Sequence, residues 1–318
     1  MKRSLFAVAV AACVLVPVAA RAQSLDAGVK LFESKKYSEA KAVFAPVAGQ
    51  NAEAAYYMGR IAIAENDDKA AGWFEKATKM NPASSVYIEW YGRALGDQAG
   101  HASKWRLPFL APKVKNAFEK AVALDPNNID AREDMMQYYI QAPSILGGSR
   151  QKARETAVEI KKRNPYRGGF DVATVCIGDK DFAGAEREML AVKSKFPDSS
   201  AAYTQLGAFY ANQKQFDKSF AILDERLKMK PDDMAATFGI GRTGGLSGQN
   251  LDRAEKALKS YLASPPAVNA ISPANVHFRL GSVYEKQGKK ELARAEYKTA
   301  LQLNPKLEDA KKARDELR

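Results

Sequence analysis

The chain has 318 residues, 46% of them apolar, so it can bury a sizeable core as one large domain, two smaller domains or an array of repeats. Its formal net charge is +12, and it contains only two cysteines and two histidines. These counts exclude a disulfide-stabilised scaffold and leave a histidine-based metal site short of ligands.

Residues 1–22 have the layout of a signal peptide. Lys2 and Arg3 form a short basic start, an apolar run follows, and the Ala-Arg-Ala triplet that ends at Ala22 suits cleavage. We therefore expect cleavage after Ala22 and a periplasmic protein. The apolar run falls short of the roughly 20 residues that span a membrane, and no later stretch is apolar enough, so no transmembrane segment is expected in the mature chain.

A lipoprotein signal is an alternative for the same segment, because residues 10–13 resemble a lipobox that would leave Cys13 lipidated. The residues after Cys13 stay apolar where a lipoprotein usually turns polar, so we favour the cleavable signal. Cleavage removes three basic residues together with Cys13, which lowers the charge from +12 to +9 and leaves Cys176 as the sole cysteine. Cys176 then cannot form an intramolecular disulfide, and we expect it to be a small buried apolar residue.

Prolines recur after the signal, at the ends of helical patterns. Successive prolines of this set are 44, 39, 32, 34, 34 and 40 residues apart. A period near 34 residues is typical of solenoids built from paired helices. The set consists of Pro82, Pro126, Pro165, Pro197, Pro231, Pro265 and Pro305.

Residues 96–115 lengthen the first of these intervals and read as a long insertion between two helices. The segment carries aromatic residues among basic ones, notably Trp105, Arg106 and Phe109. Packed inward, which we favour, the aromatic residues would cover the flank of the solenoid. Exposed, they would give a partner or a polymer an accessory contact.

Residues 140–154 resemble a phosphate-binding loop, since they contain two glycines and a serine before a helical run. A P-loop needs G-x-x-x-x-G-K-[ST] after a buried strand, and both the spacing and the strand are missing here. Instead, we predict that Pro143 ends one helix, that Gly147 and Gly148 form a turn within an insertion over 142–149, and that Ser149 caps the next helix. The start of that helix, beside Arg150, could still accept an anion.

Residues 238–266 follow a helical pattern that is unusually rich in glycine, and each interior glycine costs about 1 kcal/mol relative to alanine. We expect either a short or irregular helix or unusually close contact with a neighbour. The glycines are Gly239, Gly241, Gly244, Gly245 and Gly248.

Two amphipathic helical patterns are clearest between Leu280 and Pro305. Gly281 and Ala293 would let the two helices approach closely, and Gly288 marks the turn between them. The positions on the paired faces are Leu280, Gly281 and Tyr284 in the first pattern and Ala293, Tyr297 and Ala300 in the second.

This unit resembles the tetratricopeptide repeat (TPR) family, and the resemblance extends over nearly the whole mature chain. It implies an all-α fold: a right-handed α-solenoid of about eight helix-turn-helix repeats in a single domain, 23–318. The charged residues 306–318 would form its C-terminal capping helix. The pattern recurs at Leu206, Gly207, Tyr210, Leu223 and Pro231; at Ala173, Cys176, Ala185, Met189, Val192 and Pro197; at Met135, Tyr139, Ala153, Ala157, Ile160 and Pro165; at Phe118, Ala121 and Pro126; at Gly59, Phe74, Ala77 and Pro82; and at Gly28, Leu31, Ala40 and Phe44.

The sequence contains no catalytic constellation. Motifs of zinc proteases, dithiol redox proteins and serine hydrolases are absent, and His101 and His277 are isolated. Acid pairs such as Asp67-Asp68 fall in turns or at helix starts, where carboxylates favour the helix dipole. We therefore predict a protein that is not an enzyme and has no metal site and no cofactor.

The resemblance also implies that the first helices of the repeats line a concave groove that binds partners. Arginines and aromatic residues recur among the groove positions and favour an acidic or carboxylate-bearing ligand. The family's clamp for terminal carboxylates does not match, because Val29 and Arg60 stand at two of its positions. The predicted groove residues are Tyr56, Arg60, Glu89, Arg93, Gln137, Arg167, Phe170, Thr174, Phe238, Arg242, Phe278 and Lys286.

Two functions follow from these observations. The favoured one is a periplasmic adaptor or scaffold that binds a protein or peptide in the cell envelope through the groove. The alternative is binding of an anionic envelope polymer, such as an acidic exopolysaccharide during assembly or export. Nucleic acid is not expected as a partner in this compartment.

Overall fold

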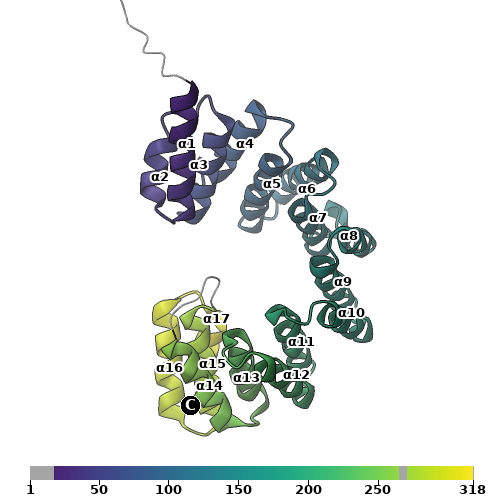
Figure 1. The fold of residues 1–318 in the computed structure, drawn as a ribbon, viewed down its shortest axis with the longest axis vertical. Helices are drawn as coiled ribbons and strands as arrows, with labels where there is room; N and C mark the ends of the chain where they lie inside the picture. The colour runs from purple at the N-terminus through teal and green to yellow at the C-terminus, as the bar shows by residue number, and fades with distance from the viewer. Residues whose placement is uncertain (1–17, 265–270, 318) are drawn as a thin grey trace, which may run out of the picture. The chain divides into compact units, whose positions relative to one another are not determined.

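The computed structural model describes residues 18–264 and 271–317, and this part of the chain is helical throughout, without strands (Figure 1). Residues 1–17, which include Cys13 and most of the apolar run of the predicted signal peptide, lie outside the described residues. The chain divides after Arg163 into two compact units, each of which has its own stack of paired helices. None of the described helices is both long and apolar enough to cross a membrane.

Unit 1, up to Arg163, contains four antiparallel helix pairs, in which each odd-numbered helix packs against the helix that follows it. A short 3-10 helix, η1, stands between the helices of the fourth pair. The elements are α1 (Val18–Glu33), α2 (Tyr37–Phe44), α3 (Ala52–Ala64), α4 (Ala70–Met80), α5 (Ser85–Gly100), α6 (Leu107–Leu124), α7 (Ile129–Gln141), η1 (Ser144–Leu146) and α8 (Arg150–Arg163).

Unit 2, from Asn164 onward, contains four more pairs and a last helix that packs on α16. Ala310 of this last helix is fully buried, so the predicted capping helix is confirmed. The pairs number eight along the described chain, as the repeat pattern predicts. The elements are α9 (Pro165–Gly178), α10 (Phe182–Lys195), α11 (Ser200–Asn212), α12 (Phe216–Met229), α13 (Met234–Ser247), α14 (Leu251–Ala263), α15 (Pro273–Lys286), α16 (Lys290–Leu303) and α17 (Glu308–Glu316).

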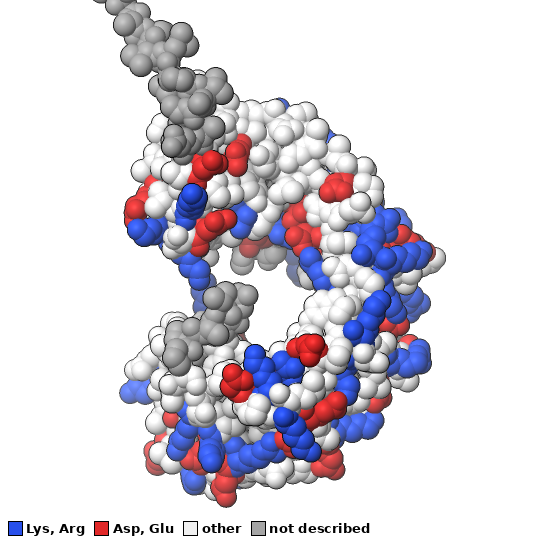
Figure 2. All heavy atoms as spheres, in the orientation of Figure 1, with Lys and Arg blue, Asp and Glu red and all other residues white. Residues whose placement is uncertain are grey.

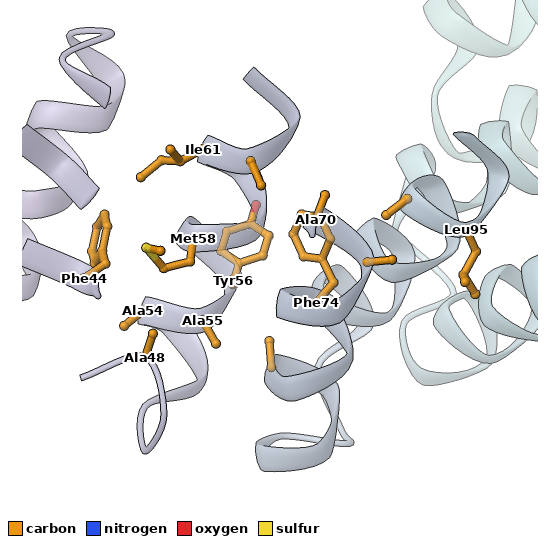
Figure 3. Close-up of a cluster of buried hydrophobic side chains, with 14 of the residues drawn as sticks. Phe44, Ala48, Ala54, Ala55, Tyr56, Met58, Ile61, Ala70, Phe74 and Leu95 are labelled. Atoms are coloured by element: carbon orange, nitrogen blue, oxygen red, sulfur yellow. The ribbon is translucent and has the colours of Figure 1, made fainter. Parts of the chain in front are cut away.

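Small residues let the two helices of a pair come together, as the sequence predicts. A Cβ atom on Gly59 would lie 2.7 Å from the ring of Phe74, and a Cβ atom on Gly281 would lie 2.5 Å from the ring of Tyr297. In unit 1 these contacts continue into a core in which Phe44, Tyr56 and Phe74 pack between successive pairs (Figure 3). Cys176 also packs against a core cluster but is only half-buried, so the expectation of a buried cysteine holds in part.

The glycine-rich helix α13 is neither short nor irregular, so that expectation is wrong. It spans 14 residues and ends at Ser247, and the following Gly248 adopts the left-handed conformation typical of a helix C-terminus. Its glycines instead allow close contact with a neighbour, which was the other prediction. A Cβ atom on Gly241 would lie 2.3 Å from Leu258, and a Cβ atom on Gly244 would lie 2.4 Å from Ala254. Because α14 packs directly on these positions, the contact offsets the glycines' low helix propensity.

The predicted insertion over 96–115 is mostly helical, which corrects the expectation of a long loop. Only residues 101–106 lie between α5 and α6. Inward packing is also wrong for Trp105 and Phe109, which are 72% and 71% exposed. The inward face of α6 is already filled by Ala111, Val114 and Phe118 at helical spacing, which leaves Phe109 on the solvent side.

The turn over 142–149 forms as predicted. Helix α7 ends before Pro143, Gly147 has a φ of 95°, and the Ser149 hydroxyl accepts a hydrogen bond from the Lys152 amide at 3.3 Å. The turn joins two helices and follows no strand, so it lacks the context of a P-loop.

Candidate functional site

Four of the predicted groove residues meet on the first helices of unit 1. Helix α3 supplies Tyr56 and Arg60, and the next first helix, α5, supplies Glu89 and Arg93. The side chains of these helices contact one another because α3 and α5 belong to neighbouring pairs that share one core. Gln137 lies on α7, farther along the same unit.

Arg60 is held by aromatic rings. Its guanidinium lies 4.0 Å from the ring centroid of Trp90 and 5.0 Å from that of Phe32, and it donates a hydrogen bond of 2.7 Å to the Tyr56 hydroxyl. Cation–π contacts of this kind stabilise a half-buried cation by about 1 kcal/mol. The charge of Arg60 therefore contributes to the packing of α1, α3 and α5.

Arg93 is neutralised within the protein. It donates to Asp134 of α7 at 2.5 Å and forms an ion pair with Glu89 at 3.0 Å. Glu89 is only 2% exposed and also accepts a 2.8 Å hydrogen bond from Asn128. Burial raises the pKa of the Glu89 and Asp134 carboxyls, although Arg93 opposes the shift. Two carboxyl groups thus share one guanidinium.

Arg242 of unit 2 has a different environment. It lines a pocket of about 310 Å3 together with Phe238 and with Thr204 of α11. Its guanidinium donates to the Asn212 side-chain oxygen at 2.7 Å but forms no ion pair within the described residues. Burial lowers the pKa of the Arg242 guanidinium.

Arg279 of α15 stands near Arg242 and was not predicted from the sequence. Burial, and then the charge of Arg242, lower the pKa of the Arg279 guanidinium, while Asp309 opposes the shift. Arg279 packs 4.6 Å from the ring of Phe278, and it too lacks an ion pair in the part of the chain that the structure describes. Figure 2 shows basic side chains gathered beside α11 and α13. The sequence signal was present, because Arg279 directly follows the predicted residue Phe278.

The other predicted groove residues are placed as follows. On α9, Phe170 packs 5.4 Å from the ring of Tyr166, and Thr174 donates to the Phe170 carbonyl. Phe278 is buried, and Lys286 is exposed at the end of α15. Arg167 lies in the first turn of α9, where its amide donates to Asn164.

Two further sets of side chains bear on function. Trp105, Arg106 and Phe109 are all exposed around the start of α6.

His277 forms a 2.6 Å contact with Glu296. No group of three or more histidine, cysteine or carboxylate side chains that could hold a metal ion occurs among the residues the structure describes.

Comparison with known proteins agrees with the fold. Residues 274–307 match the sequence model of the tetratricopeptide repeat. A solved tetratricopeptide repeat protein from Parabacteroides merdae has a TM-score of 0.57 at 17% identity, with 84% of this chain and 98% of that chain covered. The human IFIT1 dimer with PPP-AAAA has a TM-score of 0.55 at 17% identity, with coverages of 91% and 71%. At these identities the likeness concerns the fold alone.

One curated relative is much longer than this chain. The human protein O-mannosyl-transferase TMTC1 is 25% identical over 232 residues, which are 70% of this chain and 21% of that protein. The chain therefore spans about a fifth of the length of this relative.

Proposed function

The chain is a tetratricopeptide repeat protein, and we propose that it is a non-enzymatic periplasmic adaptor or scaffold that binds a protein or peptide segment through the first helices of its repeats. Stacked helical repeats expose extended surfaces that suit such binding. The predicted signal peptide supports the periplasmic location, and the missing catalytic motifs support a role without catalysis.

The observation that carries the proposal is the pair Arg242 and Arg279. Two half-buried guanidinium groups lie near each other, and neither forms an ion pair within the described chain, although the charge of Asp309 acts on Arg279. A half-buried cation that lacks an ion pair has lost part of its hydration, and an anionic ligand would compensate for that loss. An acidic side chain of a partner fits this site, and the neighbouring ring of Phe238 offers an apolar contact beside it.

The test is capture of the partner in intact cells. A tagged copy is crosslinked, and the captured species are identified by mass spectrometry for the wild type and for the variant R242E/R279E. We expect one dominant protein whose yield falls at least about tenfold in the variant, in line with the loss of two charge-assisted contacts.

The matched control is K228E/K256E, which makes the same change in charge at two exposed lysines on second helices of the same unit. This control should capture the partner as the wild type does, and circular dichroism should show that both variants are folded. Equal capture by the wild type and R242E/R279E, or capture of bulk envelope proteins alone, would contradict the proposal.

A second candidate function is binding of an anionic envelope polymer. The exposure of Trp105 and Phe109 beside Arg106 favours it, since aromatic faces and a cation together suit an acidic polysaccharide. Binding of polygalacturonate should weaken between about 50 and 200 mM salt and should fall in W105A/F109A. Affinity that is indifferent to salt and to these substitutions would remove this candidate.

A further inference from the structure

The two segments that lengthen the repeats of unit 1 meet at one place. Helix α5 continues to Gly100, α6 begins early at Leu107, and η1 packs against α6. The Tyr138 hydroxyl donates a hydrogen bond to the Leu146 carbonyl and fixes η1 on α7. Together these elements line an open cavity of about 430 Å3 that lies entirely within unit 1.

The walls of this cavity are mostly apolar. Helix α6 contributes Leu107, Val114 and Phe118, and η1 contributes Leu146. Small residues of α5, among them Ala99, leave the space open. Such walls suit the methylene chain of a long side chain, which gains from leaving water.

One side of the cavity is polar and has unused hydrogen-bonding capacity. Asp134 accepts from Arg93 through Oδ2, while its Oδ1 takes part in no hydrogen bond with the described residues. The side-chain amides of Gln137 and Gln141 also line the cavity and have no partner in the described protein. A carboxylate oxygen and two amide oxygens are therefore available to a donor.

The charged side chains that line the cavity are Arg93 and Asp134. Arg93 already pairs with both Asp134 and Glu89, so the carboxylates in this cluster outnumber the cation. Asp130 and Glu133 add negative potential at Asp134, and Figure 2 shows acidic side chains beside α5 and α7. Lys115 of α6 pairs with Glu119 of the same helix at 3.5 Å.

We propose that this cavity binds the side chain of an arginine or a lysine of a partner peptide. The stem of that side chain lies against Val114 and Phe118, and its charged head donates to Asp134 Oδ1 and to the amide oxygens. The inference rests on the proposed role in peptide binding but names a second site, separate from Arg242 and opposite to it in the charge it selects.

The probes for the test are the methylamides of N-acetylarginine, N-acetyllysine, N-acetylnorleucine and N-acetylglutamate. Each is titrated into the full-length protein, and the side-chain amide signals of Gln137 and Gln141 are followed by nitrogen-15 NMR. We expect saturable shifts with the arginine and lysine probes and at least about fivefold weaker binding of the norleucine probe, which offers the stem without the charge.

Three variants locate the binding. D134N should weaken the arginine probe at least about fivefold, and A99L should do so by filling the cavity while it leaves the ion pair intact. D97N is the matched control, because Asp97 is an exposed carboxylate of α5 that does not line the cavity, and it should bind the probe as the wild type does.

Several results would overturn this inference. Equal binding of the norleucine probe would make the cavity merely apolar, and tighter binding of the glutamate probe would make Arg93 the ligand. Absence of shifts with every probe would also overturn it. None of these results would touch the Arg242 site, whose own variant tests the proposed function.

Discussion

The arginines of the two units stand on equivalent first helices but differ in what surrounds them. In unit 1, Arg60 lies among aromatic rings and Arg93 is shared by two carboxylates. In unit 2, Arg242 and Arg279 are half-buried and form no ion pair in the described chain. The difference teaches that an arginine at a groove position indicates binding only where the protein leaves its charge uncompensated.

The largest expected effect tests the structural role of Arg93. R93A leaves the buried carboxylate of Glu89 without its cation, so the free energy of unfolding of unit 1 should fall by about 3 kcal/mol. R242A should change the stability of unit 2 by less than about 1 kcal/mol, because no ion pair is lost. All three tryptophans lie in unit 1, so urea unfolding followed by tryptophan fluorescence reports R93A, and circular dichroism reports R242A. An R93A protein as stable as the wild type would contradict the proposed difference between Arg93 and Arg242.

A smaller effect concerns the stability of unit 2 at acid pH. A hydrogen bond from Lys259, with smaller contributions from Gln287 and Lys289, lowers the pKa of Glu255 to about 2. Burial opposes this shift. Since the pKa in the folded state lies below its ordinary value, Glu255 stabilises unit 2 above about pH 4.5, and this contribution is lost as the pH falls toward 2. E255Q should therefore remove about 1 kcal/mol of the acid-induced loss of stability, after allowance for solvent screening.

The carboxyls of unit 1 should respond in the opposite direction. Burial raises the pKa of Glu89 and Asp134, so the folded state holds their protons more tightly than the unfolded state does. Their contribution to stability is present at low pH and is lost as the pH rises through the raised values. Urea unfolding of E255Q and of E89Q at pH 3 and pH 6 compares the two units, and parallel pH profiles of both variants would contradict the difference.

The smallest effect lies in a turn. Lys214, between α11 and α12, has a φ of 58°, whereas the equivalent turn between α15 and α16 has Gly288 with a φ of 76°. A left-handed conformation costs an ordinary residue about 1 kcal/mol, so K214G should stabilise unit 2 by about 0.5–1 kcal/mol. The melting temperature measures this, and a lower value than that of the wild type would show that the Lys214 side chain contributes more than its backbone costs.

Much of the fold could be predicted because the repeat places small and large residues at fixed helical positions. Gly281 against Tyr297 and the helix stops before the prolines follow from local rules. The extension of α6 was missed even though Leu107, Ala111 and Val114 keep a helical spacing. Its two prolines and the preceding polar residues pointed to a loop, and tertiary packing overrode them.

The site was predicted only in part because its key partners come from other repeats. Asp134 is 41 residues from Arg93, and no local pattern pairs them. Arg279 was missed by one position, since the register of a helix face is uncertain by one residue at the sequence level. Which arginine is paired with a carboxylate depends on these distant side chains. The sequence therefore shows the arginines but not which of them are paired.

The most direct measurement follows the four arginine side chains at once. Their Nε–H signals, assigned by single substitutions, are recorded by nitrogen-15 NMR while an acetylated, amidated tetraglutamate peptide is titrated into the full-length protein. The account predicts saturable shifts of the Arg242 and Arg279 signals with those of Arg60 and Arg93 unchanged. Shifts at Arg60 or Arg93, or no shift at Arg242 and Arg279, would contradict it.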